Sequence, residues 1–489
     1  MPTPKRRRKR ASKAPVRVVR PKIARDYRGF LVVRMRPTDA LSLLNRLEDI
    51  PRIAGLMGTY GVKSASPLIR SVALEELRQR ERGWKVPAEK SLAAYWRLDT
   101  RHLERGRLEE LIRALQEFPE VSLAYVDPPV SIPVTPSNDL LVKRQRYLNK
   151  APTGIDAKWA WTQVGGSGSG VRVVDLEGGW HTHVDLPAVQ LLPGVSVEVD
   201  GDIACRHGTM VLGIIVSLDN TKGGVGIAPD ATISVASHWR SNPQGGSTPV
   251  NPNACSRPSD FSLGGHVADT IASLLPHLAP GDVLLLEIQR EHPTLAALLA
   301  LPTEIVQADF DAIEIATNLG IVVVECAGNN GENLDQFPKL DRNHAQFKDS
   351  GAIMVAGCDA KVSTKIVSKA TLTKPAKKLK GHKPWIGSNV GSRIDCHAWA
   401  EKVATTGLDS SLGSIYVKTF GGTSAAAAIV AGAVAVVQSA RKANNQAPLS
   451  PKQMRDVLRS TGTPQYPSTK NIGTMPDLKK AIPAALALP

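Results

Sequence analysis

Four polar residues, far apart along the chain, stand where catalytic side chains are expected. Asp175 ends the apolar segment VRVVD, and Asn329 follows the apolar segment VVVECAG. Ligands of open α/β sheets collect at the carboxyl ends of the strands, so we expect both side chains at that edge. His207 begins an apolar helical pattern, and Ser424 begins another that is apolar enough to be central. We therefore consider the four residues as one candidate site.

These residue types fit nucleophilic catalysis. A serine hydroxyl is a weak nucleophile near neutral pH and needs an adjacent base, which histidine can supply. A buried aspartate fixes the imidazole tautomer and stabilises the imidazolium. The Asn329 amide and the backbone N–H of Ser424 can donate to the oxyanion of a tetrahedral intermediate. Each pattern is common alone, but the order Asp, His, Ser makes the combination specific.

The segments around these residues resemble the motifs of the subtilase family. RHGTMVLG is similar to the family's His motif, GGTSAAAA to its Ser motif and AGNNG to its oxyanion segment. VVDLEGG stands where the family has its Asp segment. The resemblance extends from about residue 140 to about residue 480, and its joint specificity is high.

The resemblance implies an α/β, subtilisin-like fold with a mostly parallel, seven-stranded sheet flanked by helices. It also implies a serine endopeptidase that acts on polypeptides through an acyl-enzyme on Ser424. His207 would be the general acid and base, Asp175 its orienting carboxylate and Asn329 the oxyanion donor. No cofactor is required for this chemistry. Structural calcium is frequent in the family, but no segment here can be assigned to it, so no metal ligand is predicted.

The chain departs from the family pattern beside two of its motifs. Ala428 replaces the proline that usually ends the Ser motif, and a helix holds alanine more easily than proline. Leu176 and Glu177 replace the usual Thr-Gly after the aspartate. We expect neither change to remove the catalytic groups.

The segment GDVLLLEIQ departs from the family where substrate should bind. The usual Ser-Leu-Gly is replaced, and we expect the substrate-binding residues to be Glu287, Ile288, Gln289, Cys326 and Gly328. One hypothesis is that Glu287 and Glu325 make the pocket acidic and favour basic residues before the cut. The alternative, which we favour slightly, is that these glutamates pair internally or point away.

Composition divides the chain into four parts. Residues 1–25 hold eleven Lys and Arg and no acid, and we expect a disordered basic tail there. Residues 26–130 have the mixed pattern of a small α+β domain. Residues 131–139 form a proline-rich linker, and 140–489 the catalytic domain. In that last part we expect strands at VRVVDL, TISVAS, VLLLEI, IVVVECA and AIMVAG, and helices near 207–217, 263–276, 308–319, 424–440 and 451–461.

The pattern of residues 26–130 suggests a ferredoxin-like split βαβ arrangement. Strands are expected at 29–35, 92–98 and 120–126, with helical patterns at 38–50 and 104–118. This part loosely resembles a subtilase pro-domain, so we expect it to act as an intramolecular inhibitor whose tail lies in the active-site cleft. An unrelated accessory domain is the alternative.

Cysteine content and the N-terminal sequence suggest a location. The five cysteines form no CxxC, so we expect reduced thiols by default, although one bridge stays open. The basic start lacks the apolar stretch of a secretory signal. The longest apolar run, 425–437, is shorter than the ~20 residues of a membrane span and is expected to be a buried helix. These observations predict a cytoplasmic protein without a transmembrane segment.

Two other functions stay open. The chain can be a catalytically silent subtilase fold that serves as a binding module, because Glu287 and Gln289 depart from the family. It can also be a nucleic-acid-binding protein, because the tail 1–25 can bind an anionic partner. The Lys-rich insertion 361–383 is expected to be a solvated surface feature, with an anionic partner as the lesser alternative.

Overall fold

The computed structural model describes residues 29–36, 46–127, 130–131, 145–199, 201–220, 223–240, 255, 265–291, 299–366 and 378–489. The basic tail 1–25, with its expected anionic partner, lies outside the described residues. So do most of the linker 131–139 and the centre of the insertion 361–383. The expected domain boundaries stay predictions.

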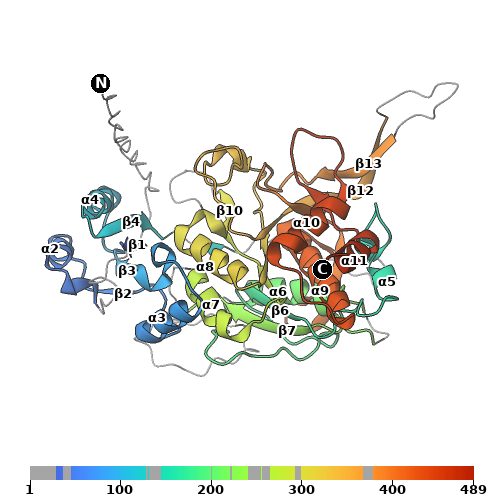
Figure 1. Cartoon of the computed structure of the whole chain (residues 1–489), viewed down its shortest axis with the longest axis horizontal. Helices are drawn as coiled ribbons and strands as arrows, with labels where there is room; N and C mark the ends of the chain where they lie inside the picture. Colours follow the sequence, from blue (N-terminus) through green and yellow to red (C-terminus); the bar gives the residue numbers. More distant parts are fainter. Residues whose placement is uncertain are drawn as a thin grey trace, which may run out of the picture.

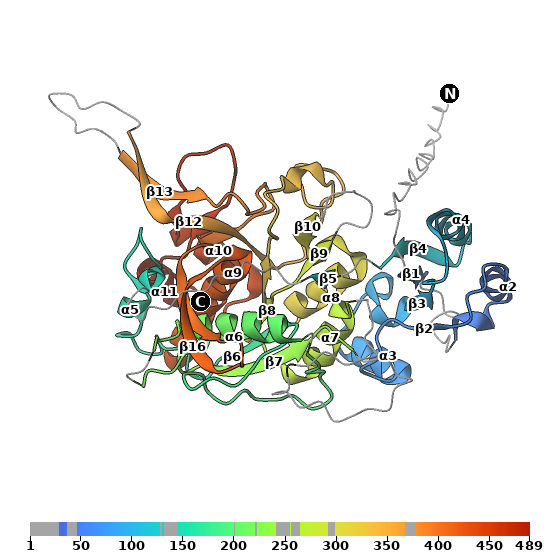
Figure 2. The same ribbon diagram turned by 180° about the vertical axis from the view of Figure 1, so that it is seen from behind.

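A large sheet forms the centre of the chain (Figures 1 and 2). In the described part of the chain, seven neighbouring strands run parallel in the order β18-β14-β12-β11-β8-β6-β7, and β17 and β13 pair antiparallel with β18 and β12. The strands are β6 (Arg172–Glu177), β7 (Thr232–Ser237), β8 (Val283–Leu286), β11 (Val322–Cys326), β12 (Ile353–Ile366), β13 (Lys378–Pro384), β14 (Cys396–Trp399), β17 (Thr463–Pro464) and β18 (Thr474–Met475). The predicted mostly parallel α/β fold and its five apolar strands are confirmed.

Helices cover both faces of this sheet, which explains why its strands are apolar throughout. Because side chains alternate along a strand, Val173 and Leu285 face one core, and Val174 and Leu284 face the other. The first core contains α6 (Asp202–Val216), α9 (Gly422–Ala443), α10 (Pro451–Thr461) and α11 (Leu478–Leu486). The second contains α7 (Val267–Leu274) and α8 (Gln307–Asn318).

Helix α9 is the central helix that its composition predicts. It is long and apolar enough to cross a membrane, yet its most apolar 18-residue window is 100% buried inside the protein. A helix that is apolar on all sides needs such an environment. Its burial confirms the prediction of a core helix for residues 425–437.

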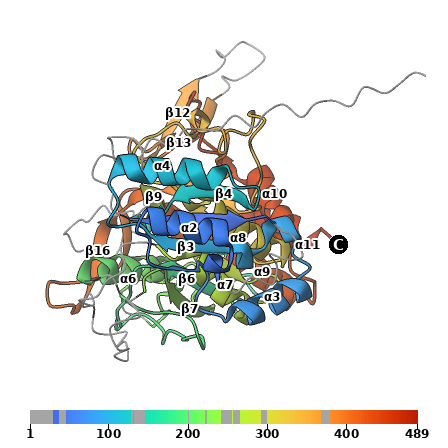
Figure 3. The same ribbon diagram turned by 90° about the vertical axis from the view of Figure 1, so that its left-hand side faces the viewer.

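The N-terminal part forms a second sheet with the order β2-β3-β1-β4, all pairs antiparallel. It consists of β1 (Phe30–Met35), β2 (Ala65–Pro67), β3 (Tyr95–Asp99), β4 (Val121–Val126), α2 (Pro51–Thr59), α3 (Leu74–Gly83) and α4 (Arg105–Gln116). Helices α2 and α4 cover one face of it (Figure 3). The order is that of the expected ferredoxin-like arrangement. The sequence did not predict α2, β2 and α3, and most of the helix expected at 38–50 lies outside the described residues.

The other face of the N-terminal sheet packs on α7 and α8. Buried ion pairs in this interface link the N-terminal part to Arg290 and, through it, to α8. Asp127 is 2.9 Å from Arg97 and 3.7 Å from Arg290, and Arg290 lies 2.6 Å from Asp309. Asp269 accepts hydrogen bonds from Ser71 of the N-terminal part. Because buried charges are costly without their partners, the interface is specific for this docking.

Smaller elements complete the structure. A three-stranded antiparallel sheet has the order β10-β9-β5, and β15 pairs with β16. Strands β12 and β13 extend beyond the central sheet as an arm whose described end is exposed, as expected for the Lys-rich insertion (Figures 1 and 2). The remaining elements are β5 (Val130–Ser131), β9 (Gln289–Glu291), β10 (Ala300–Pro302), β15 (Val403–Leu408), β16 (Ser414–Phe420) and α5 (Ala157–Ala160).

Candidate active site

Three carboxyl groups lie at the carboxyl ends of β6 and β8, on the face covered by α6 and α9. Asp175 and Glu177 share a face with Val173 because side chains alternate along the strand. Glu287 directly follows β8, two residues after Leu285. All three carboxyl side chains are fully buried. This is the sheet edge at which the catalytic groups were expected.

His207 meets Glu177, not Asp175. Its Nδ1 lies 2.5 Å from Oε2 of Glu177, and both side chains are 0% exposed. The prediction that the Asp175 carboxylate holds this imidazole is therefore wrong. The reason is reach: Glu177 lies about 6.6 Å farther along the strand, and its side chain is longer by one methylene. The other Glu177 oxygen accepts the backbone N–H of Gly178 at 3.1 Å.

Asp175 is engaged elsewhere. Its Oδ2 accepts a hydrogen bond from the indole Nε1 of Trp180 at 2.8 Å, and Oδ1 has no hydrogen-bond partner among the described residues. Burial raises the pKa of Asp175 well above its usual value, and the nearby charge of Glu177 raises this pKa further. Burial therefore favours the neutral form of the Asp175 carboxyl group.

Helix α6 approaches the loop after β6 closely because Gly208 has no side chain. A Cβ at Gly208 would lie 2.2 Å from the carbonyl oxygen of Gly179. On another side, the His207 ring meets the Phe420 ring edge-on, with centroids 5.5 Å apart. Phe420 ends β16 just before α9, so this contact ties His207 to the start of the helix that carries Ser424.

Ser424 lies in the first turn of α9, next to Asn329. Oδ1 of Asn329 accepts the backbone N–H of Thr423 at 2.8 Å and its hydroxyl at 3.1 Å. Gly422 has φ +78°, a backbone conformation that glycine adopts without strain, and it allows this tight start of the helix. Since Oδ1 is the acceptor, the Nδ2 donor of Asn329 must face away from Thr423, toward β9.

Glu287 lies against Ser424. Both Glu287 carboxyl oxygens are buried without a hydrogen-bond partner among the described residues. Burial raises the pKa of Glu287 well above its usual value, the charges of Asp175 and Glu177 add to this, and the nearby Ser424 hydroxyl lowers it. Glu325 accepts the backbone N–H of Glu304 at 3.0 Å. Both glutamate side chains are fully buried, which favours the alternative that they point away over an acidic pocket for basic residues.

The other residues expected to bind substrate gather around Asn329. Oε1 of Gln289 accepts the Asn329 backbone N–H at 3.2 Å and its Nδ2 at 3.4 Å. The Cys326 thiol donates to the carbonyl oxygen of Ile288 at 3.2 Å. Gly328 has φ +97°, and a Cβ there would lie 2.2 Å from a backbone carbonyl oxygen. Their role in substrate binding stays a prediction.

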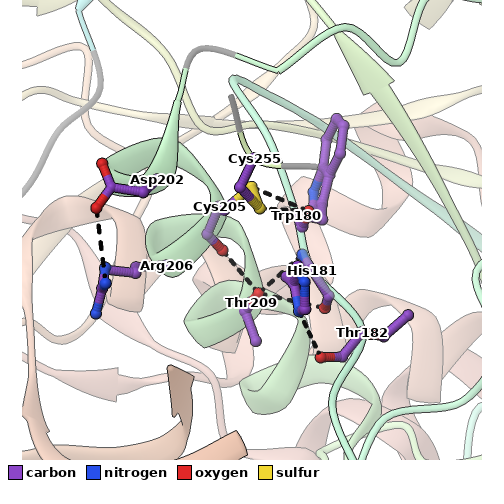
Figure 4. Close-up of a disulfide and its surroundings, with 8 residues drawn as sticks. All are labelled: Trp180, His181, Thr182, Asp202, Cys205, Arg206, Thr209 and Cys255. Atoms are coloured by element: carbon purple, nitrogen blue, oxygen red, sulfur yellow. Dashed lines mark hydrogen bonds and ion pairs between the residues drawn. A yellow bond between two sulfur atoms is a disulfide. The ribbon is translucent and has the colours of Figure 1, made fainter. Parts of the chain in front are cut away.

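A disulfide joins the start of α6 to a distant segment (Figure 4). Cys205, two residues before His207, is bonded to Cys255, and its Sγ lies 3.2 Å from the carbonyl oxygen of Trp180. The expectation that Cys205 is a small reduced thiol is wrong, because a partner fifty residues away cannot be identified from spacing alone. Cys326, Cys358 and Cys396 are free and buried.

Replacing Cys205 and Cys255 with serine is expected to lower the free energy of unfolding by about 2–4 kcal/mol, because the unfolded chain gains the entropy of an open loop. Denaturant unfolding of the full chain measures this. Reductant present throughout should cause the same loss in the unsubstituted protein and none in the double variant. Equal stability of the two proteins without reductant would contradict the prediction.

Sequence reasoning missed Glu177, Trp180 and Phe420. The spacing of Glu177 two residues after Asp175 was the available signal, because it places both on one face of the strand. No comparable signal marked Trp180 or Phe420. Among the described residues no group of three or more His, Cys, Asp and Glu side chains is arranged to hold a metal ion.

The chain is similar to known proteases, among them one named extracellular and one described as keratinolytic. An extracellular protease of Xanthomonas campestris pv. campestris is 25% identical over 407 residues, covering 74% of this chain and 58% of the relative. Subtilisin Savinase of Lederbergia lenta is 28% identical over 201 residues, covering 38% of this chain and 62% of the relative. The chain thus spans less than two thirds of either relative. Fervidolysin of Fervidobacterium pennivorans, a keratinolytic enzyme related to subtilisin, has a TM-score of 0.54 at 17% identity, over 96% of this chain and 65% of its own, a likeness of fold alone.

These relatives correct the expected location. The Xanthomonas relative is named an extracellular protease, which points to secretion. The prediction of a cytoplasmic protein is therefore wrong. The Cys205–Cys255 disulfide agrees with this correction, because disulfides form and persist in oxidising compartments.

The family model described as the subtilase family matches residues 200–475, more than half of the chain. The match includes His207, Asn329 and Ser424, and it begins after β6, so Asp175 and Glu177 lie outside it. On this match, and with a fold that agrees, the chain belongs to the subtilase family.

Proposed function

We propose that this chain is a serine endopeptidase that cleaves polypeptides through an acyl-enzyme on Ser424. One observation carries the proposal: a buried imidazole, held at Nδ1 by a carboxylate, and a serine at the start of α9 share one carboxyl cluster beside an amide donor. A serine nucleophile, an imidazole base with its orienting carboxylate, and an oxyanion donor are the parts that acyl transfer requires.

The chemistry proceeds in two halves. Nε2 of His207 takes the proton of the Ser424 hydroxyl while Oγ bonds to the scissile carbonyl carbon. The carbonyl oxygen becomes an oxyanion that accepts from Nδ2 of Asn329 and from the backbone at the positive end of α9. His207 then gives its proton to the leaving amine as the C–N bond breaks. Water repeats the sequence and releases the acid.

We further propose that the protein is made as a self-inhibited precursor. Strand β5 pairs antiparallel with β9, with Ser131 opposite Gln289, whose side chain contacts Asn329. An added strand at a sheet edge is a common mode of binding an extended peptide. The tail of the N-terminal domain thus occupies an edge where substrate would lie, and the buried ion pairs of the interface support this docking.

A catalytically silent subtilase fold remains the second candidate. The buried carboxyl group of Glu287 near Ser424 is the observation that favours it, because such a group can compete with His207 for the serine proton. Turnover separates the two functions, since a binding module produces no new chain ends.

The test is incubation of the purified full chain, followed by N-terminal sequencing of its fragments and a fluorescein-casein assay. We expect a cut near residues 127–140 and casein hydrolysis, both absent in Ser424→Ala and both present in Ser460→Ala, which changes an exposed serine of α10. Equal hydrolysis by Ser424→Ala, or none by the unsubstituted chain, would overturn the endopeptidase proposal. Casein hydrolysis without the internal cut would overturn only the precursor.

A further inference from the structure

We propose that Glu177 is the positioning residue of His207, in the place where the family has an aspartate. The inference rests on the endopeptidase proposal and deepens it. Glu177 would fix the tautomer with the proton on Nδ1, leave Nε2 to face the serine, and stabilise the imidazolium that forms during each proton transfer.

The contact geometry supports this assignment. The Oε2–Nδ1 distance of 2.5 Å is that of a short, charge-assisted hydrogen bond between two buried groups. Oε1 is held by the Gly178 N–H, so both carboxylate oxygens have a partner and the rotamer is fixed. A carboxylate held at both oxygens can in turn orient the imidazole.

The surroundings of Asp175 make it unsuited to the same role. Its Oδ2 is engaged by the Trp180 indole. Burial and the nearby charge of Glu177 raise the pKa of Asp175 and of Glu287, which favours the neutral form of both groups. A neutral acid stabilises an imidazolium less than a carboxylate does.

The titratable side chains that share this buried cluster come from three elements. Asp175 and Glu177 come from β6, His207 comes from α6, and Glu287 follows β8. Of the three carboxyl groups, Glu177 carries the hydrogen bond to Nδ1 of the ring. The match to the family model starts at residue 200, so it includes His207 but neither Asp175 nor Glu177.

The test compares Glu177→Gln with Asp175→Asn, two isosteric changes two residues apart. Variants are matured with a trace of unsubstituted protein, and kcat and KM are measured on a peptide identified from a library. We expect Glu177→Gln to lower kcat by about 10⁴-fold, the loss that the corresponding Asp→Asn change causes in a chymotrypsin-type triad. KM should change less than about threefold. Asp175→Asn should cost at most about tenfold.

A second readout does not depend on activity. In full-length Ser424→Ala protein, the Nδ1 proton of His207 should give a strongly downfield ¹H resonance at low pH. It should persist with Asp175→Asn and disappear with Glu177→Gln. The reverse pattern in either measurement would overturn the assignment. If Glu177→Gln does not fold, Asp175→Asn alone decides. A loss of kcat of about 10⁴-fold, or loss of the downfield resonance, in Asp175→Asn would overturn the assignment of Glu177. Retained activity and a retained resonance in Asp175→Asn would support it.

The two proposals fail separately. Full casein activity in Ser424→Ala would end the endopeptidase proposal, whatever Glu177 does. Inactive Ser424→Ala together with an active Glu177→Gln would end only the assignment of Glu177.

Discussion

Replacing His207 with alanine is expected to lower kcat for a peptide substrate by about 10⁶-fold, the loss that removing this residue type causes in subtilisin. Without the imidazole, the Ser424 hydroxyl has no general base and the leaving amine no proton donor. KM should change little, because His207 is fully buried and contacts Glu177 and Phe420.

The matched control for this change is His181→Ala. His181 is half-buried, and its Nδ1 hydrogen-bonds only its neighbour's carbonyl oxygen in the structure as described. Steady-state kinetics of both variants test whether His207 is the general base, and thermal unfolding confirms that both variants fold. A loss below about tenfold for His207→Ala, or an equal loss for both histidines, would contradict the assigned role.

Replacing Asn329 with alanine is expected to lower kcat by about 10²–10³-fold, the cost measured for the corresponding amide donor in subtilisin. The amide donates to charge that exists only in the transition state, so KM should stay nearly constant. The substitution also removes the acceptor of the Thr423 N–H, which costs about 1–3 kcal/mol of stability.

Asn330→Ala serves as the control for this second change. Asn330 is adjacent and exposed, and its backbone N–H, not its side chain, donates to Oδ1 of Asn389. Its kcat should stay within about twofold of the unsubstituted protein. An Asn329 variant that raises KM while leaving kcat unchanged would show a ground-state role, which contradicts oxyanion stabilisation.

The sequence was most informative where physical signals are local. The runs that form β6, β8 and β11 are apolar throughout because both faces of the sheet are covered, and α9 is apolar on every side for the same reason. The motif residues His207, Asn329 and Ser424 were found because the family keeps them next to such elements.

The sequence was least informative where a contact depends on how far a side chain extends or on which distant residue it meets. Asp175 and Glu177 are equivalent by strand alternation, and only the position of α6 selects Glu177. The disulfide partner of Cys205 is fifty residues away in the sequence, so no local pattern identifies it. Helix α3 was missed because its sequence LEELRQRERG offers few apolar positions. It packs against the second core through Leu77, a contact that depends on the tertiary structure and not on the local pattern.

Covalent labelling of the purified full chain with a fluorophosphonate, mapped by peptide mass spectrometry, tests directly whether Ser424 is a nucleophile activated by His207. We expect one adduct, on Ser424, that is lost in Ser424→Ala and formed at least about 10³-fold more slowly in His207→Ala. An adduct on another serine, or labelling of Ser424 at the same rate without His207, would contradict it.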